Sequence, residues 1–171
     1  MTHISTYSMP FKRRLSQKTN YRKRISLLKG SVPRAGIRKS SNSTIVQIVE
    51  FDPVGDKTVV SFKSMDLAKF GWTMHMGNLS AAYLTGLAAG MKAKGRGVNR
   101  AVLDIGLLTP VHKSRVFAAL KGLVDAGIEV PHDAGIFPEA QRIKGAHLKE
   151  NAVTLFDKVK SEIEKKFGEN K

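Results

Sequence analysis

The stretch that decides the fold is residues 34–64, "RAGIRKSSNSTIVQIVEFDPVGDKTVVSFKS". It contains three runs of β-type residues, at 34–40, 43–51 and 57–64. The segment "DPVGD" at 52–56 suits a hairpin loop because it contains proline and glycine. Three consecutive strands with short loops predict an antiparallel meander. The middle run is apolar on both of its faces, so we expect the sheet to be covered on both sides.

Helix and strand patterns alternate after the meander. "GNLSAAYLTGLAAGMKAKG" at 77–95 has a helical apolar stripe, and Asn78 is its predicted N-cap. "AVLDI" at 101–105 predicts a short buried strand. A second helix is expected in "KSRVFAALKGLVDAG" at 113–127, with Gly127 where a helix C-cap belongs.

The C-terminal part predicts one more strand and one more helix. We expect a short strand in "IEV" (128–130), irregular structure over 131–147, and a helix near 149–167 that ends at Gly168. The order of elements predicts an α/β fold: a mixed sheet that opens with a three-strand antiparallel meander, with helices packed on its faces.

Three segments are expected along the chain. They are an extended basic arm (1–31), an α/β domain (32–148), and a C-terminal helix and tail (149–171). Within the arm, "TNYRKRISLLKG" at 19–30 predicts one or two helical turns, and the rest should be extended.

The arm carries an unusual charge. The chain has 29 basic and 14 acidic residues, for a net charge of +15, yet its first acidic residue is Glu50. Eleven of the basic residues lie among the first forty. Such asymmetry points to a polyanionic partner, either nucleic acid or an anionic membrane surface. The arm is rich in arginine, which suits phosphate, and Phe11 and Tyr21 offer stacking faces for bases. It lacks the sustained apolar face of a membrane helix, so RNA or DNA is the expected partner.

Several other chemistries find no support in the sequence. There is no cysteine for disulfides or thiolate ligands, no Walker loop, and no nucleophile motif. We therefore expect no cofactor and no metal site. The N-terminus lacks a secretory signal and the longest apolar stretch is too short for a bilayer, so we expect a soluble cytoplasmic protein. The histidines are scattered: His3, His75, His112, His132 and His147.

A metal-dependent nuclease remains an alternative. The predicted sheet is compatible with a ribonuclease-H-like topology, and Asp104 ends a buried strand as a catalytic aspartate would. Two-metal hydrolysis needs several convergent carboxylates, but the first strand carries Arg34, Arg38 and Lys39 instead. We therefore interpret Asp104 as a residue that binds backbone donors or caps the turn after it. A general RNA chaperone is the second alternative.

Several blocks resemble the archaeal form of the large-subunit ribosomal protein family numbered eighteen, whose members bind 5S rRNA. The first is "YSMPFKRRLSQKTNYRKRISLLKGSVPRAGIRKSSNSTIVQIVEF" at 7–51. The likeness continues in "GDKTVVSFKS", "GNLSAAYLTGLAAG", "VLDIGL", "SRVFAALKGLVDAGIEVPH" and "FPEAQRIKGAHL". It covers roughly residues 7 to 167, in the order of the family.

The resemblance implies a structural, non-catalytic protein that holds 5S rRNA against the large-subunit (23S) rRNA at the central protuberance. It implies a fold related to the ribonuclease-H-like class, and neighbouring ribosomal proteins as partners, among them the one numbered five. The contacts carried over by position are Lys12, Arg13, Arg14, Tyr21, Arg22, Arg24, Lys29, Arg34, Arg38, Ser40, Asn42, Asn78, Tyr83, Lys113, Arg115, Arg142, Lys144 and His147.

Overall fold

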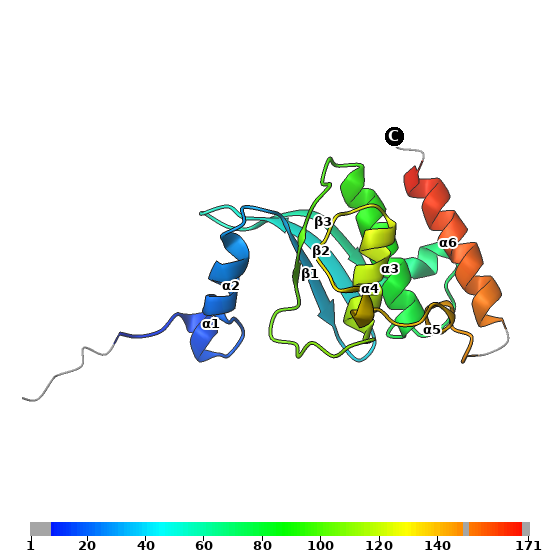
Figure 1. The fold of residues 1–171 in the computed structure, drawn as a ribbon, viewed down its shortest axis with the longest axis horizontal. Helices are drawn as coiled ribbons and strands as arrows, with labels where there is room; N and C mark the ends of the chain where they lie inside the picture. Colours follow the sequence, from blue (N-terminus) through cyan, green and yellow to red (C-terminus); the bar gives the residue numbers. More distant parts are fainter. Residues whose placement is uncertain (1–7, 149–150, 169–171) are drawn as a thin grey trace, which may run out of the picture.

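The computed structural model describes residues 8–148 and 151–168, and Figure 1 shows an α/β body from which the N-terminal arm projects. The sheet has four strands in the order β3-β2-β1-β4. The strands are β1 (Arg34–Lys39), β2 (Thr44–Glu50), β3 (Lys57–Lys63) and β4 (Val102–Asp104).

The first three strands form the predicted antiparallel meander. β1 pairs with β2 from Arg34 opposite Val49 to Lys39 opposite Thr44, and a register shift at Ile48/Val49 interrupts the pairing of β2 with β3. β4 lies parallel to β1, so the sheet is mixed, as expected. The predicted strand at 128–130 is reduced to a single parallel bridge between Arg100 and Glu129.

The two predicted central helices are confirmed as α3 (Leu79–Lys94) and α4 (Arg115–Asp125). The Asn78 side chain caps α3, because its oxygen accepts a 2.7 Å hydrogen bond from the backbone N–H of Ala81. Beyond the end of α4, Gly127 adopts a φ of +91°, which glycine tolerates without a Cβ clash. Both caps therefore lie where the sequence predicts them.

A C-terminal helix and three short helices complete the body. The C-terminal helix is α6 (Ala152–Gly168), and residues 149–150 of its predicted range lie outside the described residues. The segment expected to be irregular contains two short helices, and the connection after β3 contains one. These are η1 (Ser64–Phe70), η2 (Ala134–Ile136) and α5 (Ala140–Lys144). No helix within residues 8–148 and 151–168 is both long and apolar enough to cross a bilayer.

The core lies between the sheet and the layer of α3 and α4, and α6 packs on the outside of α3 (Figure 1). On β1, Ala35 and Ile37 are fully buried on this inner face, while Arg34 and Arg38 alternate with them and point to the other face. α3 and α4 both pack on the inner face of the sheet. The expectation of helices packed on both faces is therefore wrong for the part of the chain that the structure describes. The charged residues of β1 make the outer face unsuited to a helical layer.

The arm is more helical than expected. α2 (Tyr21–Leu28) confirms the helical turns predicted there, and Asn20 caps it by accepting a 3.1 Å hydrogen bond from the N–H of Lys23. The prediction of extended backbone elsewhere in the arm is wrong at α1 (Lys12–Leu15), which forms one turn. No β-branched residue, glycine or proline opposes a helix in this segment.

Candidate nucleic-acid interface

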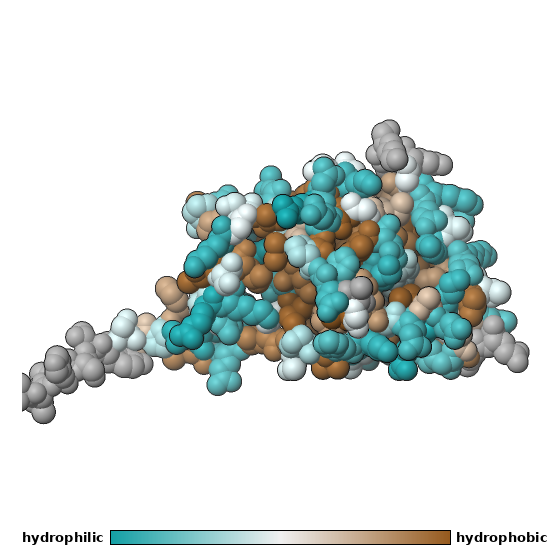
Figure 2. Space-filling view, viewed as in Figure 1, coloured by the Kyte–Doolittle hydropathy of each residue, from teal (hydrophilic) through white to brown (hydrophobic). Residues whose placement is uncertain are grey.

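A groove of about 470 Å³ separates the arm from the outer face of the sheet. We call it the arm groove. Six basic side chains line it against two carboxylates, which makes it a cationic surface. In Figure 2, the described part of the arm shows hydrophilic surface with smaller hydrophobic patches, and hydrophobic surface is visible between the arm and the helices of the body. The lining residues are Arg13, Lys18, Thr19, Asn20, Lys23, Arg24, Leu27, Arg34, Gly36, Arg38, Gln47, Val49, Asp56 and the loop 104–108.

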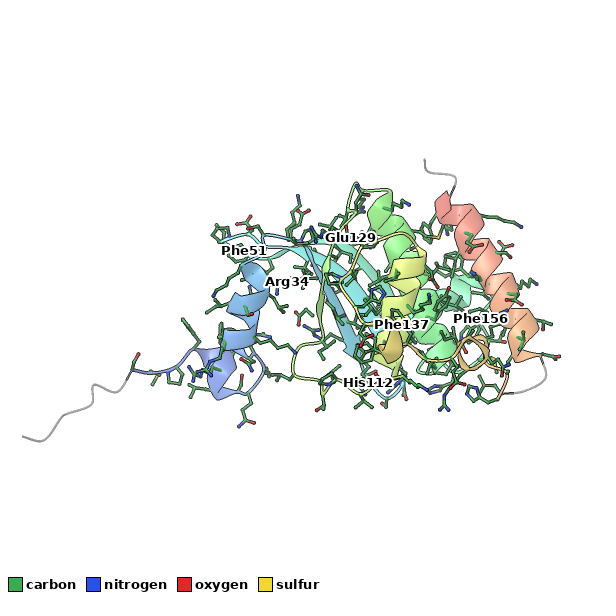
Figure 3. The ribbon with its side chains drawn as sticks, in the orientation of Figure 1. Arg34, Phe51, His112, Glu129, Phe137 and Phe156 are labelled. Carbon is green, nitrogen blue, oxygen red and sulfur yellow. The ribbon has the colours of Figure 1, made fainter. Side chains whose placement is uncertain are left out.

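Asp56 and Asp104 organise three of these arginines. Asp56 Oδ2 lies 2.8 Å from Arg24 Nη2 and 2.6 Å from Arg34 Nη2. Asp104 Oδ2 lies 3.0 Å from Arg38 Nη2 and 3.8 Å from Arg34 Nη1. Arg34 sits between the two carboxylates, and Figure 3 shows it between α2 and the sheet. The result is a network of five alternating charges, in the order Arg24, Asp56, Arg34, Asp104 and Arg38.

The burial of Arg34 bears on its predicted contact with RNA. Its side chain is only 7% exposed, and its guanidinium is already paired with carboxylates on both sides. A phosphate would have to displace one of those carboxylates to reach it, so the RNA contact of Arg34 stays a prediction that would require the network to rearrange. A buried cation of this kind needs partners, because an unpaired charge away from water is costly.

Asp104 caps the turn after β4, as its sequence position predicts. Its Oδ1 accepts a 2.8 Å hydrogen bond from the N–H of Gly106, at the turn after β4. Burial raises the pKa of Asp104, but the Gly106 N–H and the charges of Arg38 and Arg34 lower it by more, so the net pKa lies below the ordinary value. Arg38 also donates a 2.6 Å hydrogen bond to the backbone carbonyl of Asp104.

The predicted contacts on the arm itself lie on the surface. In α1, Arg13 Nε donates a 2.9 Å hydrogen bond to Thr19 Oγ1 and so closes the short loop between α1 and α2. Such exposed cations are available to a polyanion without rearrangement of the body. The exposed predicted contacts of the arm are Lys12, Arg13, Arg14, Arg22 and Lys29.

Tyr21 is half-buried, because its ring packs against that of Phe11. The ring centroids are 5.0 Å apart and the planes are tilted by 40°. Phe11 is 70% exposed, so it presents more aromatic surface than Tyr21. Sequence reasoning named both residues as stacking faces but carried only Tyr21 into the predicted site.

Arg115, Asn78 and Ser40 have structural partners. Arg115 Nη1 donates to the carbonyl of Gly77 at 2.7 Å and to that of Ser40 at 3.0 Å, and thereby ties the β1–β2 turn to the start of α3. Asn78 is the cap of α3, and the Ser40 hydroxyl lies 2.9 Å from that of Ser43 across the turn. Asn42, in the same turn, is exposed.

Tyr83, another predicted contact, lies in the core. It is 5% exposed, its hydroxyl donates a 2.9 Å hydrogen bond to Asp125 Oδ2, and its ring lies 5.6 Å from that of Phe156 in α6. Burial, the Asp125 bond and nearby carboxylates all raise the pKa of Tyr83 above its ordinary value. This side chain belongs to the core between α3, α4 and α6, so little of its surface is open to RNA, and its RNA contact stays a prediction.

The remaining predicted contacts lie apart from the arm groove. Lys113 is exposed, with its Nζ 3.3 Å from Glu139 Oε1. Arg142 and Lys144 lie on α5 and His147 follows it, all exposed, and Figure 1 shows α5 on the far side of the body from α2. The predicted residues therefore do not form one site: the exposed residues of the arm and those of α5 form two separate groups, and the others lie elsewhere on the body.

Besides Asp104, three charged groove residues were missing from the predicted set. Lys18 and Lys23 belong to the basic run and could have been chosen on charge alone; Lys23 Nζ donates a 3.3 Å hydrogen bond to the carbonyl of Gly106. Asp56 lies in the hairpin loop between β2 and β3, where nothing local distinguishes it from Asp52. Its role depends on Arg34 and Arg24, which lie 22 and 32 positions earlier in the chain.

Two comparisons with known proteins agree on the family. The family model described as ribosomal large subunit proteins 60S L5 and 50S L18 matches residues 5–96 and 91–133, well over half of the chain. The large ribosomal subunit protein uL18 of the archaeon Natronomonas pharaonis is 50% identical over 151 residues, which cover 88% of this chain and 82% of the relative. The chain therefore belongs to the family of large-subunit ribosomal proteins that comprises 60S L5 and 50S L18.

Proposed function

We propose that this protein is a structural component of the large ribosomal subunit, in the cytoplasm, which binds 5S rRNA and attaches it to the 23S rRNA at the central protuberance. Membership of the ribosomal family supports the structural role. The observation that carries the RNA-binding part is the cationic arm groove, whose six basic residues all belong to the first 49 residues, a segment without a carboxylate. An RNA backbone is the partner that such a surface attracts, since each phosphate repels carboxylates and releases counterions when cations neutralise it.

The two groups of predicted contacts suit a protein that bridges two RNA segments. The arm, with the arm groove, forms one surface, and Arg142, Lys144 and His147 form a second on the other side of the body. We assign 5S rRNA to the arm surface, because the longest acid-free segment lies there. The neighbouring large-subunit protein numbered five is a proposed protein partner at the same protuberance.

A competition assay tests the choice of RNA. Fluorescently labelled 5S rRNA is bound to the protein and displaced with unlabelled 5S rRNA, transfer RNA, or an unrelated RNA of the same length at constant salt. The proposal expects 5S rRNA to compete at a lower concentration than the other two. Equal competition by all three would favour a general RNA chaperone.

We also infer that the fold belongs to the ribonuclease-H-like class and that the protein has no catalytic activity. The mixed sheet that begins with an antiparallel meander supports the class. Against catalysis stand the arginines of β1 and the role of Asp104, whose carboxylate is engaged by Arg38 and Gly106. Within residues 8–148 and 151–168, no cluster of three or more histidine and carboxylate side chains has metal-site geometry.

Incubation of the protein with RNA and Mg²⁺ or Mn²⁺ tests this inference directly. We expect the RNA to remain intact. Metal-dependent cleavage that disappears in an Asp104→Asn variant would identify a nuclease instead.

A further inference from the structure

The carboxylate of Asp56 connects the arm to the body. It accepts hydrogen bonds from Arg24 of α2 at 2.8 Å and from Arg34 of β1 at 2.6 Å, through the same Oδ2 atom. The Asp56 side chain is 22% exposed and that of Arg24 is 34% exposed, so this pair is partly shielded from water. A partly shielded ion pair is worth more than one on the open surface, since water screens it less.

The helix that Asp56 holds has little else to hold it. None of the side chains of α2 is fully buried, and its apolar residues Leu27 and Leu28 are half-buried. Across the described ranges, its side chains make two hydrogen bonds to the body, from Arg24 to Asp56 and from Lys23 to the carbonyl of Gly106. Apolar burial is the main source of stability for a docked helix, and α2 has little of it. Its position therefore depends on polar links.

We propose that Asp56 is a positioning residue of the RNA interface. Its negative charge improves binding to a polyanion, because it fixes α2 against the sheet and thereby sets the spacing of the cations on both sides of the arm groove. This proposal rests on the RNA-binding function proposed above. It gives a functional role to the ion pair between Arg24 of the arm and Asp56 of the body.

Two physical effects of removing this charge have opposite signs. Coulomb repulsion between Asp56 and RNA phosphates would make an Asp56→Asn variant bind RNA more tightly. If Asp56 positions α2, the variant should bind RNA more weakly. The arm released from Asp56 would adopt the RNA-binding geometry for only a fraction of the time, and the apparent affinity would be reduced in proportion to that fraction. The sign of the change in affinity therefore decides between the two.

The experiment compares three variants of the full chain with the wild type, using 5S rRNA as the probe. Asp56→Asn removes the link. Asp56→Glu retains a carboxylate there. Asp52→Asn is the matched control: it removes one negative charge from the same hairpin loop, where Asp52 caps a local turn through a 3.0 Å hydrogen bond from the Val54 N–H. We expect Asp56→Asn to weaken binding about three- to tenfold, Asp56→Glu to recover most of the loss, and Asp52→Asn to equal or slightly exceed the wild type.

Trypsin supplies a readout that an overall loss of stability would not produce. Without RNA, Asp56→Asn should accelerate cleavage after Arg22, Lys23 and Arg24 in α2, while cleavage within α6 remains as in the wild type. If Asp56→Asn does not fold, Arg24→Lys decides the question, because it keeps the net charge and leaves Asp56 paired with Arg34. Lysine lacks the fork and the reach of arginine, so the same weakening and the same cleavage pattern are expected.

The proposal is overturned if Asp56→Asn binds RNA as tightly as the wild type or more tightly, or if Asp52→Asn loses as much affinity as Asp56→Asn. Failure of the underlying function looks different. In that case the wild type itself would not prefer 5S rRNA in the competition assay, whatever the variants do.

Discussion

The hydroxyl group of Tyr83 donates a 2.9 Å hydrogen bond to Asp125, and this bond joins α3 to α4. The other carboxylate oxygen of Asp125 lies 2.9 Å from Lys121 Nζ, one turn earlier in α4. On its other side, the Tyr83 ring packs against Phe156 of α6. One side chain thus connects three helices, and this structural role explains why the position is a tyrosine. The family resemblance assigns the same residue to RNA.

The Tyr83→Phe variant tests this role. It keeps the ring contact with Phe156 but leaves Asp125 without its donor, so the free energy of unfolding should fall by about 1 kcal/mol. Affinity for 5S rRNA should not change. Urea denaturation and RNA titration measure the two quantities, and a loss of affinity at unchanged stability would restore Tyr83 to the interface.

Gly86 sets the distance between α3 and α4. A Cβ there would overlap the carbonyl oxygen of Ala119, and Gly122 makes the reciprocal approach from α4 to the backbone of α3. Gly86→Ala should therefore lower the free energy of unfolding by about 1–3 kcal/mol or more, because rigid backbone atoms cannot move aside. Thermal melting measures the effect.

Gly95, at the end of α3, is the matched control for that variant. Its φ is −62° and an added Cβ would meet Met91 O at 3.7 Å, an ordinary contact. Gly95→Ala should be neutral or stabilise the fold by about 0.5 kcal/mol, through a less flexible unfolded chain. Equal losses in the two variants would show that helix spacing is not the cause.

Asp104 should make stability depend on pH in acid. Its pKa is lowered in the folded protein, so the unfolded chain binds the proton more readily, and stability rises with pH in this window. The stabilisation is present above the ordinary value near 4 and is lost as the pH falls through the folded pKa. Asp104→Asn should cost about 1–3 kcal/mol at pH 7. Its curve of unfolding free energy against pH should be flatter below about pH 4, as urea denaturation at a series of pH values would record.

The α1 arginines should contribute to RNA binding through phosphate contacts. Replacing Arg13 and Arg14 with alanine should weaken binding to all RNAs and flatten the slope of log K against log salt by about two units. The charge-matched control replaces Lys158 and Lys165 with alanine. Both belong to α6, which lies on the side of the body away from the arm (Figure 1). If the two double variants behave alike, the effect of the arm is one of net charge rather than of contact.

Much of this protein is determined by local sequence. The meander, the Asn78 and Gly127 caps, β4 and the basic arm follow from residues that are neighbours along the chain, because periodicity, turn residues and capping act over a few positions. The family resemblance rests on the same contiguous blocks.

Tertiary structure decided which of the polar residues remain available to a partner. Asp56 and Asp104 engage Arg24, Arg34 and Arg38 over separations of 22 to 70 positions. Such pairs exist only once β1 lies between β2 and β4 and α2 lies across the arm groove. The outer face of the sheet stayed without a helical layer for the same reason: the alternation on β1 places Arg34 and Arg38 there, and charged side chains brought together from distant segments make an apolar packing layer unfavourable. A sequence pattern records the charge of each residue, but the free energy of that charge depends on the neighbours that only the folded chain supplies.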